Sequence, residues 1–433
     1  MLIRTKHHLR LALVAAVVTA VLATVLPGCG GSSGGPTPGV VVGHAQITDH
    51  GTYFGVTLDF TGTTARQVGA DYGQAIKAIM PDFEAQLDTF LADMLGSDAM
   101  FAALQHRVEA IKPQLDQSYR DEIEGIASAL SGGATDKLGD GKLSLNELYM
   151  VNLNTDALRP TQCSFSSVWG QRSATRRTLS ARILDWPDGP TFPMAKCQAV
   201  VHFINGPKSI YSIGYLGYQG TLTGINQHAV FGAVLDSPSW KPYPDPPTGY
   251  YSYAFDLRHA LESTATLDGV AAAMTSHPYT FCHNIALSDP SVSRVLENDQ
   301  TPGHKRALRT DVSTLRSGVT WGITNAIAAV NSFMLPENED NFSQDLHNTA
   351  RWNSIVKQMQ SKGMTVDRQE LASVEGYFKG AVPGHATDGD VFSLASQMLM
   401  IFEPCTLRLD VAFHPRNSDW QGGPVFTSVP VSF

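Results

Sequence analysis

Cysteine is scarce in this sequence, and no metal-binding pattern accompanies it. The 433 residues contain five cysteines. They are Cys29, Cys163, Cys197, Cys282 and Cys405. Their spacings fit no zinc site, and no H-E-x-x-H sequence occurs. We therefore expect a protein without a metal centre.

Charged residues are also few, at 16% of the chain. The formal net charge is −9, and no block of basic residues occurs. A net-acidic chain without basic blocks has few groups that could neutralise the phosphates of a nucleic acid. We therefore expect no nucleic-acid partner.

The apolar run at the N-terminus is too short for a comfortable transmembrane span. It covers 16 residues, from 11 to 26, whereas a spanning helix needs ~20. Basic residues precede it, and the sequence L-P-G-C at 26–29 resembles a bacterial lipobox. We expect residues 1–28 to be a lipoprotein signal peptide and Cys29 to carry a lipid. The alternative is an ordinary secretory signal with an incidental cysteine.

Residues 29–44 predict a flexible linker that is rich in Gly, Ser and Pro. Loss of residues 1–28 removes three basic residues (Arg4, Lys6 and Arg10) and no acid, so the net charge becomes −9 − 3 = −12. We expect the mature protein at the bacterial cell envelope. The lipid on Cys29 would hold it at the membrane, facing the periplasm or the exterior.

The order of the predicted elements indicates an α+β fold. Alternating residues over 40–60 predict one or two strands, and a helical period follows from 65 to 130. Strand-like runs dominate after residue 163, with helices expected at 254–263, 267–275 and 345–362. Strands and helices in blocks, rather than strict βαβ units, favour stacked antiparallel sheets with helices outside.

One acidic segment, 136–147, partly matches a calcium-binding loop. Asp136, Asp140 and Glu147 occupy loop positions 1, 5 and 12. Position 3 is Leu138, where an oxygen ligand is required. We favour a turn followed by a helix over 143–152.

The segment from residue 161 to 186 carries the candidate chemistry. Cys163 opens a strand-like run, polar residues 171–178 interrupt it, and a second run contains Arg182 and Asp185. If the two runs pair as a hairpin, a thiol, a guanidinium and a carboxylate meet at one strand end. Taken alone, Cys163 would be a buried packing residue and the two charges a surface ion pair.

Several phrases around this hairpin resemble the isopenicillin-N acyltransferase-like autoproteolytic hydrolases, a branch of the N-terminal-nucleophile (Ntn) superfamily. Acid ceramidase, penicillin V acylase and bile salt hydrolase are more distant relatives. The phrases, in chain order, are Glu122-Ile123-Glu124-Gly125-Ile126-Ala127, Cys163-Ser164-Phe165, Arg182-Ile183-Leu184-Asp185-Trp186, Gly224-Ile225-Asn226, His283-Asn284 and Asn331-Ser332-Phe333. Ala181, Ile183 and Ser332 depart from the residues usual in the family, which puts the substrate preference in doubt.

The resemblance implies a four-layer αββα Ntn-hydrolase sandwich of two antiparallel sheets. It also implies autocleavage between Gln162 and Cys163. Residues 45–162 would become a mainly helical α segment and residues 163–433 a catalytic β segment, packed together as a heterodimer. No organic cofactor is implied.

The resemblance also implies roles for individual residues. Cys163 would be the nucleophile, with its own α-amine as the general base. Arg182 would favour the thiolate, and Asp185 would hold the α-amine. Asn284 would be the oxyanion donor; its alternative is a turn or strand-end amide. Asn226 would be a second, weaker candidate, either as donor or as substrate positioner. His283 is interpreted as structural.

The implied function is hydrolysis or acyl transfer on a small-molecule acyl amide that is not a peptide-chain bond. One alternative is a catalytically inactive ligand-binding lipoprotein of the same fold. Another is an ester or lipid-amide hydrolase. A disulfide between Cys282 and either Cys197 or Cys405 also remains open.

Overall fold

The computed structural model describes residues 39–131, 135–158, 162–237, 243–338 and 340–433. The signal peptide predicted at 1–28, the lipidation site Cys29 and most of the predicted linker lie outside these ranges. The linker was predicted to reach residue 44, but the first strand already begins at Val40. Within the described ranges, no helix has both the length and the apolarity needed to cross a membrane.

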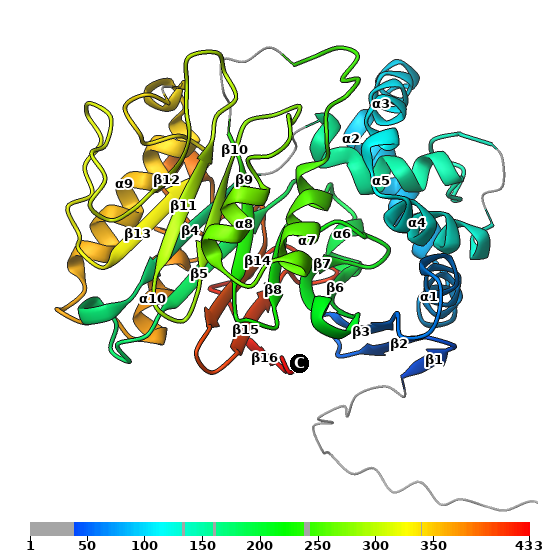
Figure 1. Cartoon of the computed structure of the whole chain (residues 1–433), viewed down its shortest axis with the longest axis horizontal. Coiled ribbons are helices and arrows are strands. Elements are labelled where there is room, and N and C mark those ends of the chain that lie inside the picture. Colours follow the sequence, from blue (N-terminus) through cyan, green and yellow to red (C-terminus); the bar gives the residue numbers. More distant parts are fainter. Residues whose placement is uncertain (1–38, 132–134, 159–161, 238–242, 339) are drawn as a thin grey trace, which may run out of the picture. The chain divides into compact units, whose positions relative to one another are not determined.

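Two sheets form the centre of the fold (Figure 1). The larger sheet has the strand order β1-β2-β3-β6-β7-β8-β9-β10-β11-β12 over the described residues. Its strands are Val40–Val42, Ala45–Asp49, Phe54–Asp59, Gln198–Ile204, Ile210–Tyr215, Thr223–Asn226, Phe231–Asp236, His283–Ser288, Ser293–Asn298 and Arg306–Arg309. The smaller sheet has the order β13-β4-β5-β14-β15-β16. Its strands are Ala326–Val330, Gln162–Val168, Leu179–Asp185, Ser396–Glu403, Arg408–Phe413 and Thr427–Val429.

Helices cover the outer face of each sheet. On the larger sheet, α7 (Tyr253–Ser263) packs on β8 and β9, and α8 (Leu267–Ala273) packs on β10. On the smaller sheet, α9 (Leu346–Ser361) packs on β13, and α10 (Arg368–Glu375) packs on β4, β5 and β14. Contacts between β4 and β9 join the two sheets face to face. The predicted fold class, a four-layer αββα sandwich, is therefore confirmed.

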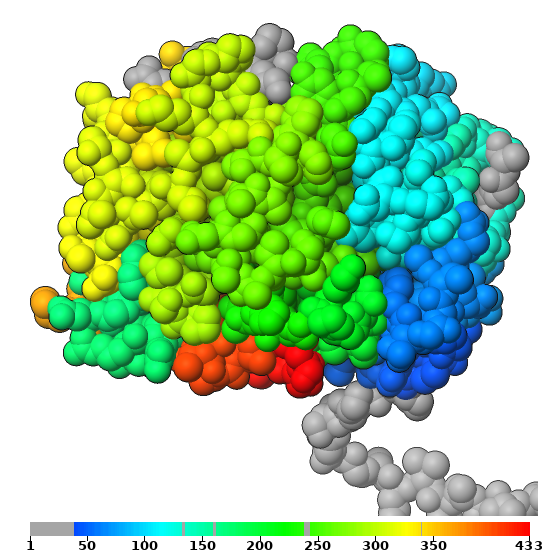
Figure 2. All heavy atoms as spheres, viewed as in Figure 1, coloured from blue at the N-terminus to red at the C-terminus, as the bar shows by residue number. Residues whose placement is uncertain are grey.

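The N-terminal segment contributes strands as well as helices. Its helices are α1 (Ala65–Ile79), α2 (Phe83–Leu95), α3 (Asp98–Ile111), α4 (Gln117–Ala129) and α5 (Leu145–Leu158), and the short α6 (Pro193–Lys196) follows after β5. Strand β3 pairs in parallel with β6, so that β1, β2 and β3 extend the larger sheet. The other strand pairs are antiparallel. Figure 2 shows this segment, in blue and cyan, packed against the green part of the chain.

The acidic segment 136–147 forms a turn ahead of α5, as favoured. Its carboxylates bind protein donors: Asp136 accepts from Ser144 Oγ and Asn146 Nδ2, and Glu147 accepts from Lys137 N and Ser144 N. These bonds account for the carboxylates without a calcium ion, and the helix begins at Leu145 rather than at 143.

Candidate active site

The nucleophile hairpin forms as predicted. Strands β4 and β5 pair in antiparallel register, with Cys163 opposite Leu184 and Phe165 opposite Arg182. Gln162 lies opposite Asp185 at the end of the pair. A short 3-10 turn at Gly170–Arg172 follows β4 within the connection to β5.

The two faces of this hairpin have different surroundings, because side chains alternate along a strand. Cys163 and Phe165 belong to the apolar cluster between the two sheets. Arg182 points the same way, since its Nη2 donates to the carbonyl of Val234 in the larger sheet at 3.1 Å. Asp185 points to the opposite face, toward α9. The thiol and the carboxylate therefore lie on opposite sides of the smaller sheet.

Arg182 contacts the thiol directly. Its Nη2 donates to Cys163 Sγ at 3.3 Å, and both side chains are fully buried. Burial raises the pKa of the Cys163 thiol to about 12, against the opposing effect of the Arg182 charge. In this uncleaved chain the thiol is thus protonated at neutral pH and needs a base to become a nucleophile.

Asp185 reaches Cys163 through an arginine that the sequence did not single out. Arg351 Nη1, on α9, donates to Asp185 Oδ2 and to the main-chain carbonyl of Cys163, both at 3.0 Å. Ser396 Oγ donates to the other carboxylate oxygen at 2.6 Å. Burial raises the pKa of Asp185, and Arg351 and Ser396 counteract this rise. Asp185 is therefore placed to act on the backbone of Cys163 rather than on its thiol.

The backbone nitrogen of Cys163 also has a buried side-chain partner. The Cys163 N–H donates to Asn331 Oδ1 at 2.5 Å. Arg351 Nη2 donates to the same oxygen at 2.8 Å, and Asn331 Nδ2 donates to the carbonyl of Asp236 at 2.8 Å. Asn331 lies in one of the family-like phrases, and this was the sequence feature that could have marked it as a site residue. Arg351 lies inside a helix without any such signal.

Asn284 lies close to this group. Its Nδ2 donates to the carbonyls of Val330 and Ser332, both at 3.1 Å, which flank Asn331. Its Oδ1 is buried without a hydrogen-bond partner among the described residues. In this uncleaved chain the amide N–H groups are thus used to hold the segment of Asn331.

Asn226 is not brought to Cys163. Its Nδ2 donates to the carbonyls of Leu261 and Thr264, and its Oδ1 accepts from the backbone N–H groups of His228 and Val230. These four bonds fix the β8–β9 turn to the end of α7. The structure gives this side chain a turn-stabilising role at a distance from the nucleophile strand.

The other cysteines and His283 lie in different surroundings. Cys197 and Cys282 are buried and Cys405 is exposed, and the disulfide considered from the sequence does not form among the described residues. His283 Nε2 contacts Asn298 Nδ2 at 3.0 Å, within the larger sheet. A structural role for His283 agrees with this contact.

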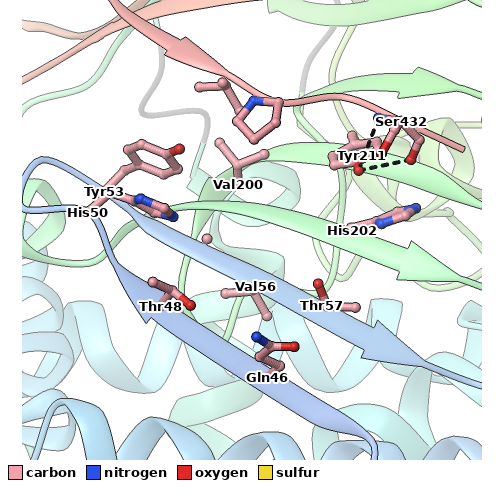
Figure 3. A pocket seen from close by; sticks show the side chains of 13 residues that line it. Gln46, Thr48, His50, Tyr53, Val56, Thr57, Val200, His202, Tyr211 and Ser432 are labelled. Carbon is pink, nitrogen blue, oxygen red and sulfur yellow. Dashed lines mark hydrogen bonds between the residues drawn. The ribbon is translucent and has the colours of Figure 1, made fainter. Parts of the chain in front are cut away.

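A cavity of about 240 Å³ lies away from the hairpin (Figure 3). Its walls come from β2, β3, β6, β7 and the C-terminal tail, and include Thr57, His202 and Ser432. The residues that hydrogen-bond to Cys163 through their side chains, Asn331, Arg182 and Arg351, do not line this cavity. Within the described ranges, no cluster of three or more His, Cys, Asp or Glu side chains could hold a metal ion.

The site lies at the N-terminal end of β4. The sandwich around it has the layer order αββα, which the Ntn resemblance implied. No protein-family model matches the chain. No curated protein matches it either.

Solved structures resemble the chain at low sequence identity. One is an N-acylethanolamine-hydrolyzing acid amidase ortholog from Caenorhabditis elegans, with 13% identity, a TM-score of 0.40, and coverage of 56% of this chain and 93% of that chain. Another is penicillin V acylase from Agrobacterium tumefaciens, with 14% identity, a TM-score of 0.34, and coverage of 60% and 85%. A third is a variant of conjugated bile acid hydrolase from Clostridium perfringens, with 9% identity, a TM-score of 0.32, and coverage of 62% and 97%.

Proposed function

We propose that this protein is a self-processing cysteine hydrolase that cleaves an acyl amide through a thioester intermediate. One observation carries the proposal. The thiol of Cys163 is contacted by Arg182, while the backbone nitrogen and carbonyl of the same residue are held by Asn331 and Arg351. Any buried backbone needs hydrogen-bond partners, but a cysteine that only fills a core needs no guanidinium on its thiol. A cysteine that must become an N-terminal nucleophile needs its backbone nitrogen and carbonyl held by side chains that stay in place after the chain is cut.

The first reaction is proposed to be cleavage of the chain itself. The Cys163 sulfur attacks the carbonyl carbon of Gln162 as the thiol gives up its proton, the Gln162–Cys163 carbon–nitrogen bond breaks, and the nitrogen takes up that proton. A thioester then joins Gln162 to the sulfur. Water hydrolyses this thioester, which yields a carboxylate on Gln162, a free thiol and a free α-amine on Cys163.

The mature site then has its own base. An α-amino group has an unperturbed pKa of about 7.7–8.0, close to neutral pH. It takes the thiol proton as the sulfur attacks the substrate carbonyl, and returns it to the leaving amine. Water resolves the acyl-enzyme, or an amine does so in acyl transfer. The guanidinium of Arg182 stabilises the thiolate, and Asp185 fixed by Arg351 holds the amine.

Asn284 remains the proposed oxyanion donor. Its amide lies on β10 beside the segment of Asn331, whose oxygen contacts the nitrogen of Cys163. For this role, one of its N–H groups must turn from the carbonyl of Val330 or Ser332 to the substrate. Loss of such a donor typically costs ~10²–10³ in rate.

The proposed substrate is a small acyl amide, in agreement with the amide-cleaving enzymes whose structures resemble this chain. No step of the proposal uses a metal or an organic cofactor. Attachment to the envelope through Cys29 is part of the proposal and rests on the N-terminal sequence.

After cleavage the two segments are proposed to stay together as a heterodimer. Strand β3 of the first pairs with β6 of the second over six residues. Glu122 on α4 forms two hydrogen bonds with Arg258 on α7, at 2.6 and 2.9 Å, and both side chains are buried. Residues of both segments also belong to one buried apolar cluster. Exposure of this apolar surface to water would oppose dissociation.

Intact mass and N-terminal sequencing of the purified protein test the proposal. We expect two fragments, the larger one beginning at Cys163, and no cleavage in a Cys163→Ala variant. Iodoacetamide should label Cys163 in the mature protein. A single uncleaved chain with an inert Cys163 would favour the inactive ligand-binding alternative.

A panel of matched amides and esters distinguishes the remaining alternative. Preferential turnover of esters would replace the amide-hydrolase proposal with an esterase. A Cys163→Ala variant that is still cut after Gln162 would show that another protease makes the cut.

A further inference from the structure

On the face opposite the thiol, strand β4 is hydrogen-bonded to a carboxyl group that the proposed mechanism does not use. Glu375, the last residue of α10, is fully buried on the face of the smaller sheet opposite the thiol. It accepts hydrogen bonds from two serines of β4. Ser164 Oγ donates to its Oε2 at 2.5 Å, and Ser166 Oγ donates to its Oε1.

The position of these serines matters for the nucleophile. Ser164 follows Cys163 directly, and its side chain points to the opposite face. Bonds at residues 164 and 166 restrain the rotation and the sliding of the strand segment that carries the thiol. Arg351 restrains the same segment at the carbonyl of Cys163.

Burial of a carboxyl group without an ion-pair contact costs free energy unless enough hydrogen-bond donors surround it. Burial raises the pKa of Glu375 to about 7, and the two serines and the charge of Arg351 counteract this rise. An apolar residue would avoid that cost. The described groups that bear on this carboxyl are Ser164 and Ser166 from β4, Asp185 from β5 and Arg351 from α9, while β14 contributes apolar Leu399 and Ile401 to the surrounding cluster.

We propose that Glu375 is a positioning residue, which holds β4 through Ser164 and Ser166 so that the Cys163 sulfur can reach the carbonyl of Gln162. This inference rests on the proposed self-processing. It adds a requirement that the family-like phrases do not contain, because Glu375 lies outside all of them. A misplacement of ~1 Å can cost ~10²-fold in rate, so loss of the tether should slow cleavage without touching the reacting atoms.

The test is the rate of conversion of purified precursor into the two fragments. Glu375→Ala should slow processing by about tenfold to 100-fold. Glu375→Gln should stay within about threefold of wild type at pH 8, because an amide can accept from one serine and donate to the other.

The pH profile separates positioning from a requirement for negative charge. A protonated Glu375 can donate to one serine and accept from the other, as a glutamine amide can. The rate of wild type relative to Glu375→Gln should therefore stay within about threefold from pH 5.5 to 8.5, although burial raises the pKa of Glu375 to about 7. A ratio that changes by more than about tenfold across this range would argue against a role in positioning.

Glu370 supplies a matched control on the same helix. It lies in the first turn of α10, where its carboxylate accepts from the N–H of Asp367 as part of a capping box. Glu370→Gln weakens this cap without touching β4 and should leave processing unchanged. Equal slowing by both variants would show that a loosened α10, rather than the tether, causes the effect.

Three outcomes would count against the inference or the function on which it rests. If Glu375→Ala does not fold, a folded Ser164→Ala variant must process more slowly than wild type; an unchanged rate overturns the tether. If wild type processes normally and Glu375→Ala does so at the same rate, only this inference fails. If wild type never processes, the proposed function itself fails.

Discussion

Replacement of Arg351 by methionine, a side chain of similar volume, should strongly destabilise the fold. The guanidinium makes five hydrogen bonds in a fully buried environment. Among them is its ion pair with Asp185, at 3.0 Å, in which neither side chain is exposed by more than 1%. Methionine would leave the Asp185 carboxylate buried without its counter-charge.

Removal of one partner of a buried ion pair costs about 3–5 kcal/mol. The structure describes 383 residues. At ~2.1 cal/mol/K per residue, the unfolding entropy near the midpoint is ~0.8 kcal/mol/K, so the cost lowers Tm by about 4–6 °C.

The measurement is calorimetry in a Cys163→Ala background, where no proposed processing can complicate the transition. Loss of Arg351 removes an effect that lowers the pKa of Asp185, so this pKa rises further above its unfolded value. A folded carboxyl with a raised pKa takes up a proton on folding, and the resulting stabilisation is present at low pH and lost as the pH rises. The loss in Tm should therefore be larger at pH 8 than at pH 5.

The double variant Arg351→Met with Asp185→Asn serves as the control. Because it removes the orphaned charge, it should recover part of the lost Tm. The reasoning is refuted if the loss is the same at both pH values and the second substitution restores nothing.

Three further predictions address the site and its surroundings. Arg182→Gln should raise the pKa of the Cys163 thiol further in the mature protein, and iodoacetamide labelling should slow about tenfold for each unit of that rise; an unchanged rate would remove Arg182 from the thiol's environment. Asn226→Ala should lower the free energy of unfolding by about 2–4 kcal/mol, since it breaks four bonds at a turn, yet leave labelling of Cys163 unchanged; slower labelling in the folded variant would return Asn226 to the site. Arg258→Met should destabilise the association of the two segments, and the effect should be smaller below pH 7. Burial raises the pKa of Glu122 to about 7, and a protonated Glu122 tolerates the loss of its partner. Chemical denaturation at pH 6 and pH 8 checks whether the destabilisation is smaller at the lower pH.

Local patterns predicted the nucleophile hairpin well. The strand runs on either side of residues 171–178 pair in the register that brings Arg182 to the thiol. This success has a physical reason, since a short connection between two strand-like runs leaves antiparallel pairing as the favoured arrangement. The helices at 254–263 and 267–275 were likewise predicted close to their observed bounds.

Other elements carried weaker local signals. Strand β13, which supplies the segment before Asn331, and helix α10, which supplies Glu375, were not predicted.

By itself, the sequence determined the order of the elements, the layered α+β architecture and the residues of the nucleophile hairpin, because these depend on side-chain period and on neighbours in the chain. Only the tertiary structure decided which distant residues complete the site. Arg351, Asn331 and Glu375 reach β4 across 168 or more positions of sequence. It also separated Asn226 from the nucleophile, because the partners of a polar side chain are set by how sheets and helices pack, and no local pattern records that packing.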